Sequence, residues 1–261
     1  MQFIVATLLA AAVALISRYF RFLTLSGAIA TFFLAAVIFG LGGWQWSIPI
    51  VTFFVSSSLL SKFGKKRKAQ FELMFEKTDA RDAGQVAANG GIAGIVMLCS
   101  YFFPAYHQWY FLYVASLAAV TADTWGTEIG LLAKSSPRSI ISLKKVEAGT
   151  SGAVTPAGIV GGACGALFIT SSGIFWITAR TVVLAFTMII FSGMFGAFLD
   201  SLLGATVQAK YRCGVCGKIT ERKLHCESPT TLVGGVRWID NDIVNWACPL
   251  GGALFFVLMT S

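Results

Sequence analysis

The chain has 261 residues, of which 56% are hydrophobic and 12% charged, with a formal net charge of +8 and a mean hydropathy of +0.74. Soluble globular domains usually carry about 25% charged residues, so the composition argues against an ordinary soluble enzyme, and the 22 Phe and 7 Trp residues exclude disorder. We therefore expect one all-α polytopic membrane domain covering residues 1–261, since the apolar runs suit helices rather than barrel strands.

Taken in chain order, the hydrophobic runs predict about eight transmembrane helices. Each run is compared with the ~20 apolar residues that a helix needs to cross a bilayer. The predicted spans are residues 2–16, 22–42, 46–61, 86–103, 110–132, 153–171, 181–203 and 243–260. The first and third runs are short, which suggests that one of them is tilted, partly buried or re-entrant.

Basic residues alternate between the connections that join these spans. Of the 20 Lys and Arg residues, all but Arg180 lie in the first, third, fifth and seventh connections. Basic loops beside spans mark the cytoplasmic side, so we expect these connections, including the long loop 204–242, in the cytoplasm. Both termini are then expected outside, and topology rather than nucleic-acid binding explains the net charge.

Three acidic residues lie inside predicted spans: Asp123, Glu128 and Asp200. Such a charge costs about 2.5–3.5 kcal/mol on insertion scales, so we expect a functional role; the alternative is an ion pair that orients two helices. Asp123 and Glu128 would lie about 140° apart on an ideal helix and would share no ligand without unwinding near Gly126. Asp200 continues a stripe of glycines that includes Gly196, which would leave room for another group.

Further polar side chains lie at the same ends of the predicted spans. The candidates near the two helix starts are Arg81, Asp82, Gln85, Asn89, Asn241, Asp242 and Asn245. Helix capping is an alternative explanation for Asp82 and Asn241. It does not explain the amides further along each helix.

The connection before the sixth span holds two lysines and a small-residue turn, Lys144 and Lys145 with Gly149-Thr150-Ser151-Gly152. A Gly/Thr/Ser turn that leads into a helix offers backbone N–H groups to an anion, although it also suits an ordinary helix cap. Carboxylates for Mg²⁺, amides and this turn are expected on one membrane face. That combination is what a phosphoryl-transfer site needs.

The loop 204–242 contains a cluster of potential metal ligands, Cys213, Cys216, His225 and Cys226. The cytosol is reducing, so a structural disulfide is not expected. This spacing is typical of tetrahedral Zn²⁺, which would fold the loop rather than take part in the chemistry. Adjacent residues such as His225 and Cys226 often point apart, so a loop without metal remains the alternative.

Several segments, in order, resemble the integral membrane family that includes plant and cyanobacterial phytyl-phosphate kinase. They are DARDAGQVAANG (79–90), ADTWGTEIG (122–130), VEAGTSGAVTPAG (146–158), GAFLDSLLGATVQ (196–208) and C-G-V-C…H-C…N-D-I-V-N (213–245). The resemblance covers most of the chain, and the first three spans are not part of it. The family also has poorly characterised animal and archaeal members.

The resemblance implies a membrane kinase that transfers the terminal phosphate of a nucleoside triphosphate, with CTP favoured, to a prenyl monophosphate such as phytyl phosphate. The lipid diphosphate would feed tocopherol and related isoprenoid synthesis. The enzyme would work in a bacterial inner or thylakoid-like membrane, with its active site facing the cytoplasm. Because the acceptor phosphate is already anionic, positioning and charge neutralisation would suffice without a strong general base.

The resemblance also implies roles for individual residues. Asp123, Glu128 and Asp200 would hold Mg²⁺, and Lys144 and Lys145 would contact phosphates during catalysis. Substrate and nucleotide would be bound by Arg81, Asp82, Gln85, Asn89, Thr127, Gly149, Thr150, Ser151, Gly152, Asn241, Asp242 and Asn245.

Two other functions remain open from the sequence. A cytidylyltransferase that makes a CDP-lipid would use the same Mg²⁺ and lipid phosphate but would attack the α-phosphate. A lipid or ion transporter would also carry intramembrane acids, but its polar groups are expected at the bilayer midplane with access to both faces.

Overall fold

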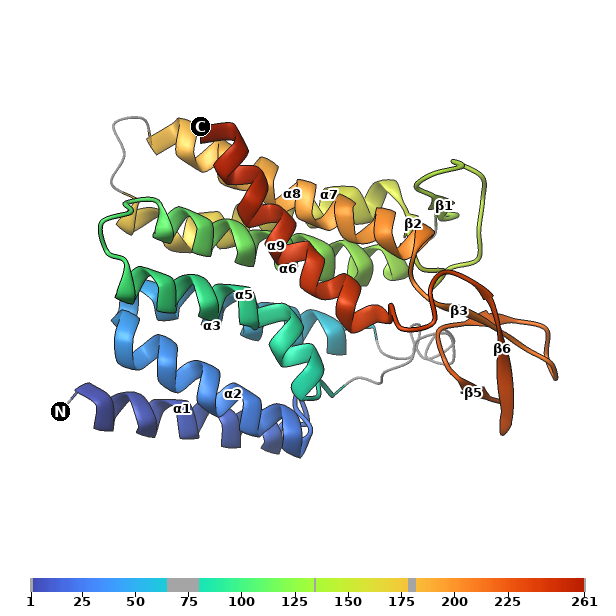
Figure 1. Cartoon of the computed structure of the whole chain (residues 1–261), viewed down its shortest axis with the longest axis horizontal. Helices are drawn as coiled ribbons and strands as arrows, with labels where there is room; N and C mark the ends of the chain where they lie inside the picture. The colour runs from blue at the N-terminus through green and yellow to red at the C-terminus, as the bar shows by residue number, and fades with distance from the viewer. Residues whose placement is uncertain (1, 65–79, 134, 178–181, 261) are drawn as a thin grey trace.

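The computed structural model describes residues 2–64, 80–133, 135–177 and 182–260. Long helices lie side by side, and a small β-rich unit extends from one end of the bundle (Figure 1). The helices are α1 (Gln2–Tyr19), α2 (Leu25–Val37), η1 (Ile38–Gly42), α3 (Gly43–Lys62), α5 (Ala83–Phe102), α6 (Trp109–Leu132), α7 (Pro156–Gly173), η3 (Ile174–Trp176), α8 (Val182–Thr206) and α9 (Asn241–Thr260). The prediction of a helical polytopic membrane protein is confirmed.

Two small antiparallel sheets lie in the connections at that end. One pairs β1 (Arg138–Ser139) with β2 (Ala153–Val154). The other has the strand order β4-β3-β6-β5. Its strands are β3 (Lys210–Cys213), β4 (Ile219–Thr220), β5 (Leu224–His225) and β6 (Ser228–Gly234). We call residues 210–234 the lobe; its strands lie within the predicted loop 204–242.

The predicted count of eight membrane spans is wrong. By length and composition, six helical segments of the described residues are apolar enough to cross a membrane: Gln2–Tyr19, Leu25–Lys62, Ala83–Phe102, Pro156–Trp176, Val182–Thr206 and Asn241–Thr260. The predicted spans 22–42 and 46–61 fall into one segment, Leu25–Lys62. The predicted span 110–132 corresponds to α6, which is not among the six.

The segment Leu25–Lys62 does not run straight. Gly43 has a φ of +61°, which glycine adopts readily, and it marks the point where η1 gives way to α3. Leu34 and Ile50 both lie within 4 Å of where a Cβ on Gly90 would stand, whereas a straight helix would hold them roughly 24 Å apart. The segment therefore reverses direction between α2 and α3, and one side chain of each helix reaches Gly90 of α5.

Helix α6 occupies the centre of the bundle, which explains how it belongs to the bundle although it is not among the six apolar segments. Residues 113–122 are buried without interruption, on every face of the helix. Helices α3, α5, α7, α8 and α9 all pack against it. A helix enclosed by other helices meets protein instead of lipid, so it can carry Ser, Thr and acidic side chains that a lipid-facing helix cannot.

Glycines allow α8 to approach α6 closely. A Cβ on Gly193 would lie 2.9 Å from the Cβ of Ala118, and one on Gly196 would lie 2.5 Å from the Cβ of Ala119. At Gly193 and Gly196 the stripe thus packs against α6, whereas Asp200 and Gly204 further along it line a cavity. The stripe brings Asp200 alongside α6 by the backbone contact that small residues permit in membranes.

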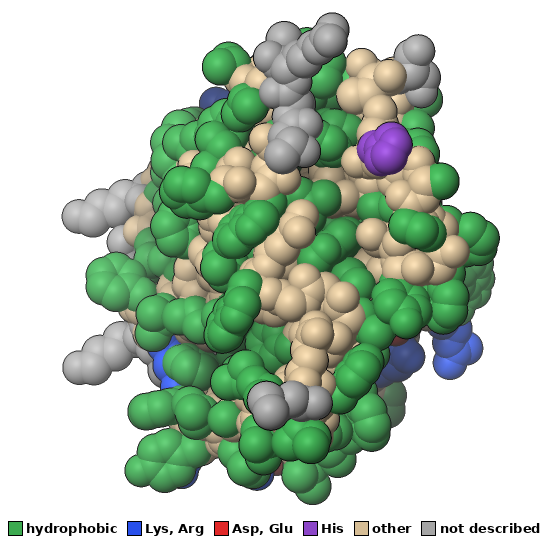
Figure 2. Space-filling view, turned by 90° about the vertical axis from the view of Figure 1, so that its left-hand side faces the viewer, with side chains coloured by type: hydrophobic (Ala, Val, Ile, Leu, Met, Phe, Trp, Pro, Cys, Tyr) green, Lys and Arg blue, Asp and Glu red, His purple; other side chains and the backbone are tan. Residues whose placement is uncertain are grey.

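The two ends of the bundle differ in composition. Gln2 donates a hydrogen bond to the carbonyl oxygen of Gly40, and Thr260 donates one to Gln108. Both ends of the described chain lie at the same end of the bundle (Figure 1). Figure 2 views this end and shows mainly hydrophobic and uncharged side chains, with Lys and Arg near the edge of the view. The β-rich lobe and the long connections lie at the other end (Figure 1).

Some charged residues used in the sequence predictions lie outside the described residues. They are Lys65, Lys66, Arg67, Lys68, Lys77, Asp79, Lys134 and Arg180.

Candidate functional site

A cavity of about 560 Å³ lies at the lobe end of the bundle, within the range of about 300–1,000 Å³ typical of small-molecule sites. Residues from α3, α5, α6, α7, α8 and α9 and from the turn before β2 line it. The predicted site residues among them are Arg81, Gln85, Asn89, Asp123, Thr127, Glu128, Gly149, Thr150, Ser151, Gly152, Asp200, Asn241 and Asn245. Segments far apart in the sequence thus contribute to a single cavity.

Carboxylates from two membrane helices and from the lobe meet in this cavity. Asp123 of α6 and Glu221 of the lobe both lie near enough to Asp200 of α8 for their charges to act on it. The Oδ2 atom of Asp200 is buried and has no hydrogen-bond partner among the described residues. A buried oxygen without a partner is unfavourable unless a ligand completes it, and converging carboxylate oxygens are the ligands that divalent cations prefer.

Glu128 faces other partners than Asp123 does. Its carboxylate accepts a hydrogen bond from the hydroxyl of Ser61, and its charge acts on the guanidinium of Arg81. Helix α6 continues unbroken to Leu132, so the five-residue spacing turns the two acids apart as expected. The cavity therefore has one region around Asp123 and Asp200 and another around Glu128 and Arg81.

Arg81 is the only Lys, Arg or His among the described residues that line the cavity. Its N–H donates to the carbonyl oxygen of Phe22, and its own carbonyl oxygen accepts the N–H of Thr24, both at 3.0 Å. Gly27 makes this contact possible, because a Cβ there would overlap the Arg81 carbonyl oxygen. Burial lowers the pKa of Arg81 to about 10, with Glu128 opposing this, so the side chain stays positively charged at neutral pH.

Capping accounts for Asp82 but not for Asn241. The Asp82 carboxylate accepts the N–H of Gln85 at 2.9 Å, and Gln85 accepts the N–H of Asp82 in return. Helix α9 is instead capped by Asp240, whose Oδ1 accepts a backbone N–H three residues on at 3.1 Å. Neither Asp82 nor Asp242 lines the cavity, so the structure does not support their predicted contacts with substrate.

The small-residue turn 149–152 does not lead directly into a helix, contrary to the prediction. Strand β2 follows it, and α7 is capped by Thr155; the turn still lines the cavity. Lys144 and Lys145 are exposed and do not line it. The backbone N–H of Ser139 donates to the carbonyl oxygen of Lys144 at 3.0 Å, which forms a turn between the two residues. Because both lysines lie outside the cavity, the predicted lysine–phosphate contacts are not supported.

Sequence reasoning missed Glu221 and Gln208, which both line the cavity together with Ser61, Thr124 and Ser201. Glu221 is only 9% exposed. Its Oε1 accepts hydrogen bonds from Ser151 at 2.7 Å and from Gln208 at 2.8 Å. Nothing in the sequence distinguishes Glu221 from the nearby exposed Glu227. The fold of the lobe, which hydropathy does not reveal, places Glu221 against the helix bundle.

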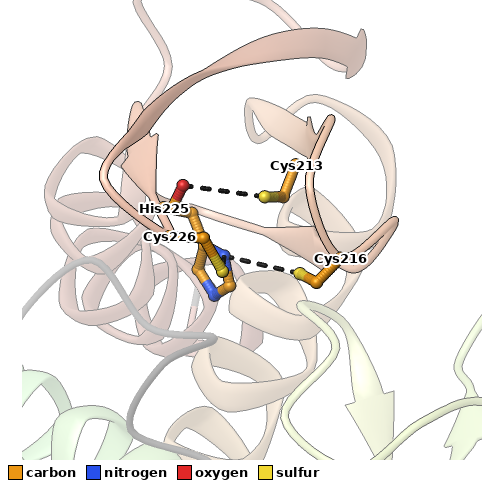
Figure 3. Close-up of side chains that lie close together, drawn as sticks. All are labelled: Cys213, Cys216, His225 and Cys226. Carbon is orange, nitrogen blue, oxygen red and sulfur yellow. Dashed lines mark hydrogen bonds between the residues drawn. The ribbon is translucent and has the colours of Figure 1, made fainter.

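The four potential zinc ligands come together in the lobe (Figure 3). One ligand atom from each of Cys213, Cys216, His225 and Cys226 lies within 4.8 Å of all the others. Cys216 and Cys226 place their sulfur atoms 3.6 and 3.2 Å from Nδ1 of His225. The cluster is separate from the cavity lining.

Comparisons with known proteins agree with a membrane location. The family model described as "Integral membrane protein DUF92" matches residues 8–253. Protein PGR of Arabidopsis thaliana is 29% identical over 94% of this chain and 91% of its own length. An uncharacterised membrane protein of Methanocaldococcus jannaschii is 29% identical, over 89% of this chain and 91% of its length. No solved structure matches the chain significantly.

Proposed function

Since this chain belongs to the DUF92 family of integral membrane proteins, we propose that it is a membrane kinase that transfers the terminal phosphate of a nucleoside triphosphate to a prenyl monophosphate. One observation carries the proposal. The same cavity is lined by carboxylates and a half-buried cation, which suit a metal-bound triphosphate, and by apolar side chains of membrane helices, which suit a lipid. The resemblance of the sequence motifs favours CTP as donor and phytyl phosphate as acceptor.

The apolar part of the lining includes partly exposed side chains of α7 and α8. Ile159 and Phe198 line the cavity, and each is 39% exposed. On α8 the exposed side chains of Phe195 and Leu202 lie on the same face as Phe198. A lipid tail can therefore remain in the bilayer while its phosphate enters the cavity.

The polar part of the lining suits a triphosphate with Mg²⁺. Asp123 and Asp200 would hold the ion, and the Asp200 oxygen that lacks a partner fits a metal ligand. When bound, Mg²⁺ neutralises charge on the phosphates. Arg81 would bind phosphate oxygens, and Glu128, itself bonded to Ser61, would orient the guanidinium. An acceptor phosphate is already anionic, so holding the two phosphates in line is the main task of the site.

The cavity lies at the end that carries the long connections, and the positive-inside rule makes that end cytoplasmic in our proposal. The opposite end is filled by aromatic side chains. Tyr110 donates to the carbonyl oxygen of Gln45, Tyr113 donates to that of Trp46, and the Trp46 and Tyr113 rings lie 4.7 Å apart. A transporter needs access from both faces, so this packing favours an enzyme.

The test is to incubate the purified protein in detergent with prenyl monophosphates of 5 to 20 carbons, with Mg²⁺, and with each of the common nucleoside triphosphates. Mass spectrometry then measures lipid diphosphates. We expect a diphosphate product that requires Mg²⁺ and forms fastest with a long-chain acceptor. If no pair of acceptor and nucleoside triphosphate gives a lipid diphosphate, the proposed activity is wrong.

Narrowing the apolar opening should change the preference for chain length. We expect Ile159→Trp to lower kcat/KM for a 20-carbon acceptor about 10-fold or more, as loss of hydrophobic pocket contacts does in other enzymes, and to affect a 5-carbon acceptor little. Val160→Trp is the matched control, because Val160 is 63% exposed on the same helix and does not line the cavity. An equal loss with both acceptors in Ile159→Trp would contradict the assigned path of the tail.

A further inference from the structure

The lobe has almost no hydrophobic core of its own. Among its apolar residues only Tyr211 and Cys213 are buried, whereas the others are exposed: Val215, Cys216, Ile219, Leu224, Cys226, Leu232 and Val233. A unit of this size cannot offset the entropy of ordering its chain by burial of so little apolar surface. Small units of this kind are usually held by disulfides or by a metal ion. The cysteines of the lobe are free thiols.

The backbone of the lobe is shaped to bring the four ligand-type side chains together. Cys213 ends β3, and a tight turn follows in which the N–H of Gly217 donates to the Cys213 carbonyl oxygen at 2.9 Å. Gly217 has a φ of +72°, which glycine tolerates without strain. This turn returns Cys216 toward the sulfur of Cys213, so the first pair of ligands is set by local geometry.

The second pair of ligands sits on a two-residue hairpin between β5 and β6. His225 pairs with Ser228, and the two residues between them, Cys226 and Glu227, have φ values of +51° and +58°. Consecutive positive φ values are typical of the tight turn that joins two strands of a hairpin. The turn brings the Cys226 sulfur to 3.2 Å from Nδ1 of His225. The side chains of these two adjacent residues therefore point toward each other and not apart (Figure 3).

The lobe also delivers a residue to the cavity. Glu221 follows β4 directly and lies in the chain between Cys216 and His225. Its carboxylate accepts hydrogen bonds from Ser151 and Gln208. Whatever fixes the two ligand pairs relative to each other therefore also fixes the position of Glu221.

We propose that Cys213, Cys216, His225 and Cys226 bind one Zn²⁺ ion, and that this ion folds the lobe and thereby seats Glu221 in the cavity. Three thiolates and one imidazole nitrogen are a common ligand set for structural zinc, with no position left for a substrate. The ion acts on the cavity only through the lobe. The proposal is independent of the kinase reaction, since neither zinc binding nor the position of Glu221 requires a substrate.

Metal analysis of the full-length protein purified in detergent tests the first half of the proposal. We expect about one zinc per chain in the wild type and loss of that zinc in Cys216→Ser. Cys164→Ser is the matched control, because Cys164 is an exposed cysteine on α7 outside the cluster, and it should retain the zinc. A wild type free of zinc, or one with a disulfide among the lobe cysteines, would overturn the assignment.

Hydrogen exchange without substrates tests the second half. Removal of zinc by a chelator should speed amide exchange about tenfold or more in residues 210–234. Removal of zinc should also speed amide exchange in the turn 149–152, because Ser151 loses its hydrogen bond to Glu221. Added zinc should restore the protection of both segments. Glu221→Ala, which removes the acceptor of the Ser151 hydrogen bond, should keep the zinc and a protected lobe but release the turn. If chelation leaves exchange in the turn unchanged, the ion does not position Glu221.

Discussion

Replacing Asp200 or Asp123 with Asn is expected to lower kcat for lipid diphosphate formation by about 10²–10³-fold, with little change in thermal stability in detergent. Asn keeps the size of the side chain but lacks the negative charge that holds a divalent cation. Loss of a group that stabilises charge in the transition state typically has an effect of this size. Steady-state rates across a range of Mg²⁺ concentrations measure it.

A second measurement separates a metal-binding role from a structural one. If the two acids hold the ion, the single variants should require more Mg²⁺ for half-maximal activity than the wild type does. Glu147→Gln is the control, because Glu147 is an exposed acid at the same end of the molecule and does not line the cavity; its activity should match the wild type. Full activity in Asp123→Asn and Asp200→Asn would rule out the metal site.

Replacing Arg81 with Gln is expected to lower kcat/KM by about 10²-fold, because the half-buried cation would no longer bind phosphate oxygens, and truncating one partner of a desolvated charge pair costs about 2 kcal/mol or more. Arg81→Lys should recover only part of this, since an ammonium group does not reproduce the fork of a guanidinium. Arg138→Gln is the control. The Arg138 guanidinium is exposed and bonds to the carbonyl oxygen of Leu143, away from the cavity lining.

The double variant Arg81→Gln with Glu128→Gln distinguishes binding of substrate from support of the fold. Removing both charges relieves the uncompensated Glu128 that the single variant leaves behind. We therefore expect the double variant to regain thermal stability but not activity. Recovery of activity together with stability would mean that Arg81 serves the fold alone.

Much of the bundle could be predicted from hydropathy, because most of its helices face lipid and must be apolar. The number of spans could not. Helix α6 is enclosed by other helices, so its membership in the bundle depends on packing. The reversal at Gly43 falls between the predicted spans 22–42 and 46–61, whereas length and hydropathy alone merge the two into the single segment Leu25–Lys62.

The position of the site followed from polar residues at equivalent ends of several spans. Asp123, Asp200 and Asn89 were found in this way, because a polar group in an apolar helix stands out. Glu221 did not stand out, since it lies among other charged residues in a loop, and only the pairing of the lobe strands returns it to the cavity. Lys144 was placed in the site for its charge, although the turn that contains it leaves it exposed.

The position of a label in the products tests the central claim most directly. The wild type would be given a prenyl monophosphate with Mg²⁺ and CTP that carries the label on its γ-phosphate, and in a parallel reaction on its α-phosphate. We predict that the γ-label appears in the lipid diphosphate and that the α-label remains in CDP. Appearance of the α-label in the lipid, with the γ-label released as pyrophosphate in the parallel reaction, would contradict phosphate transfer in this cavity. The absence of labelled lipid from both reactions would contradict it as well.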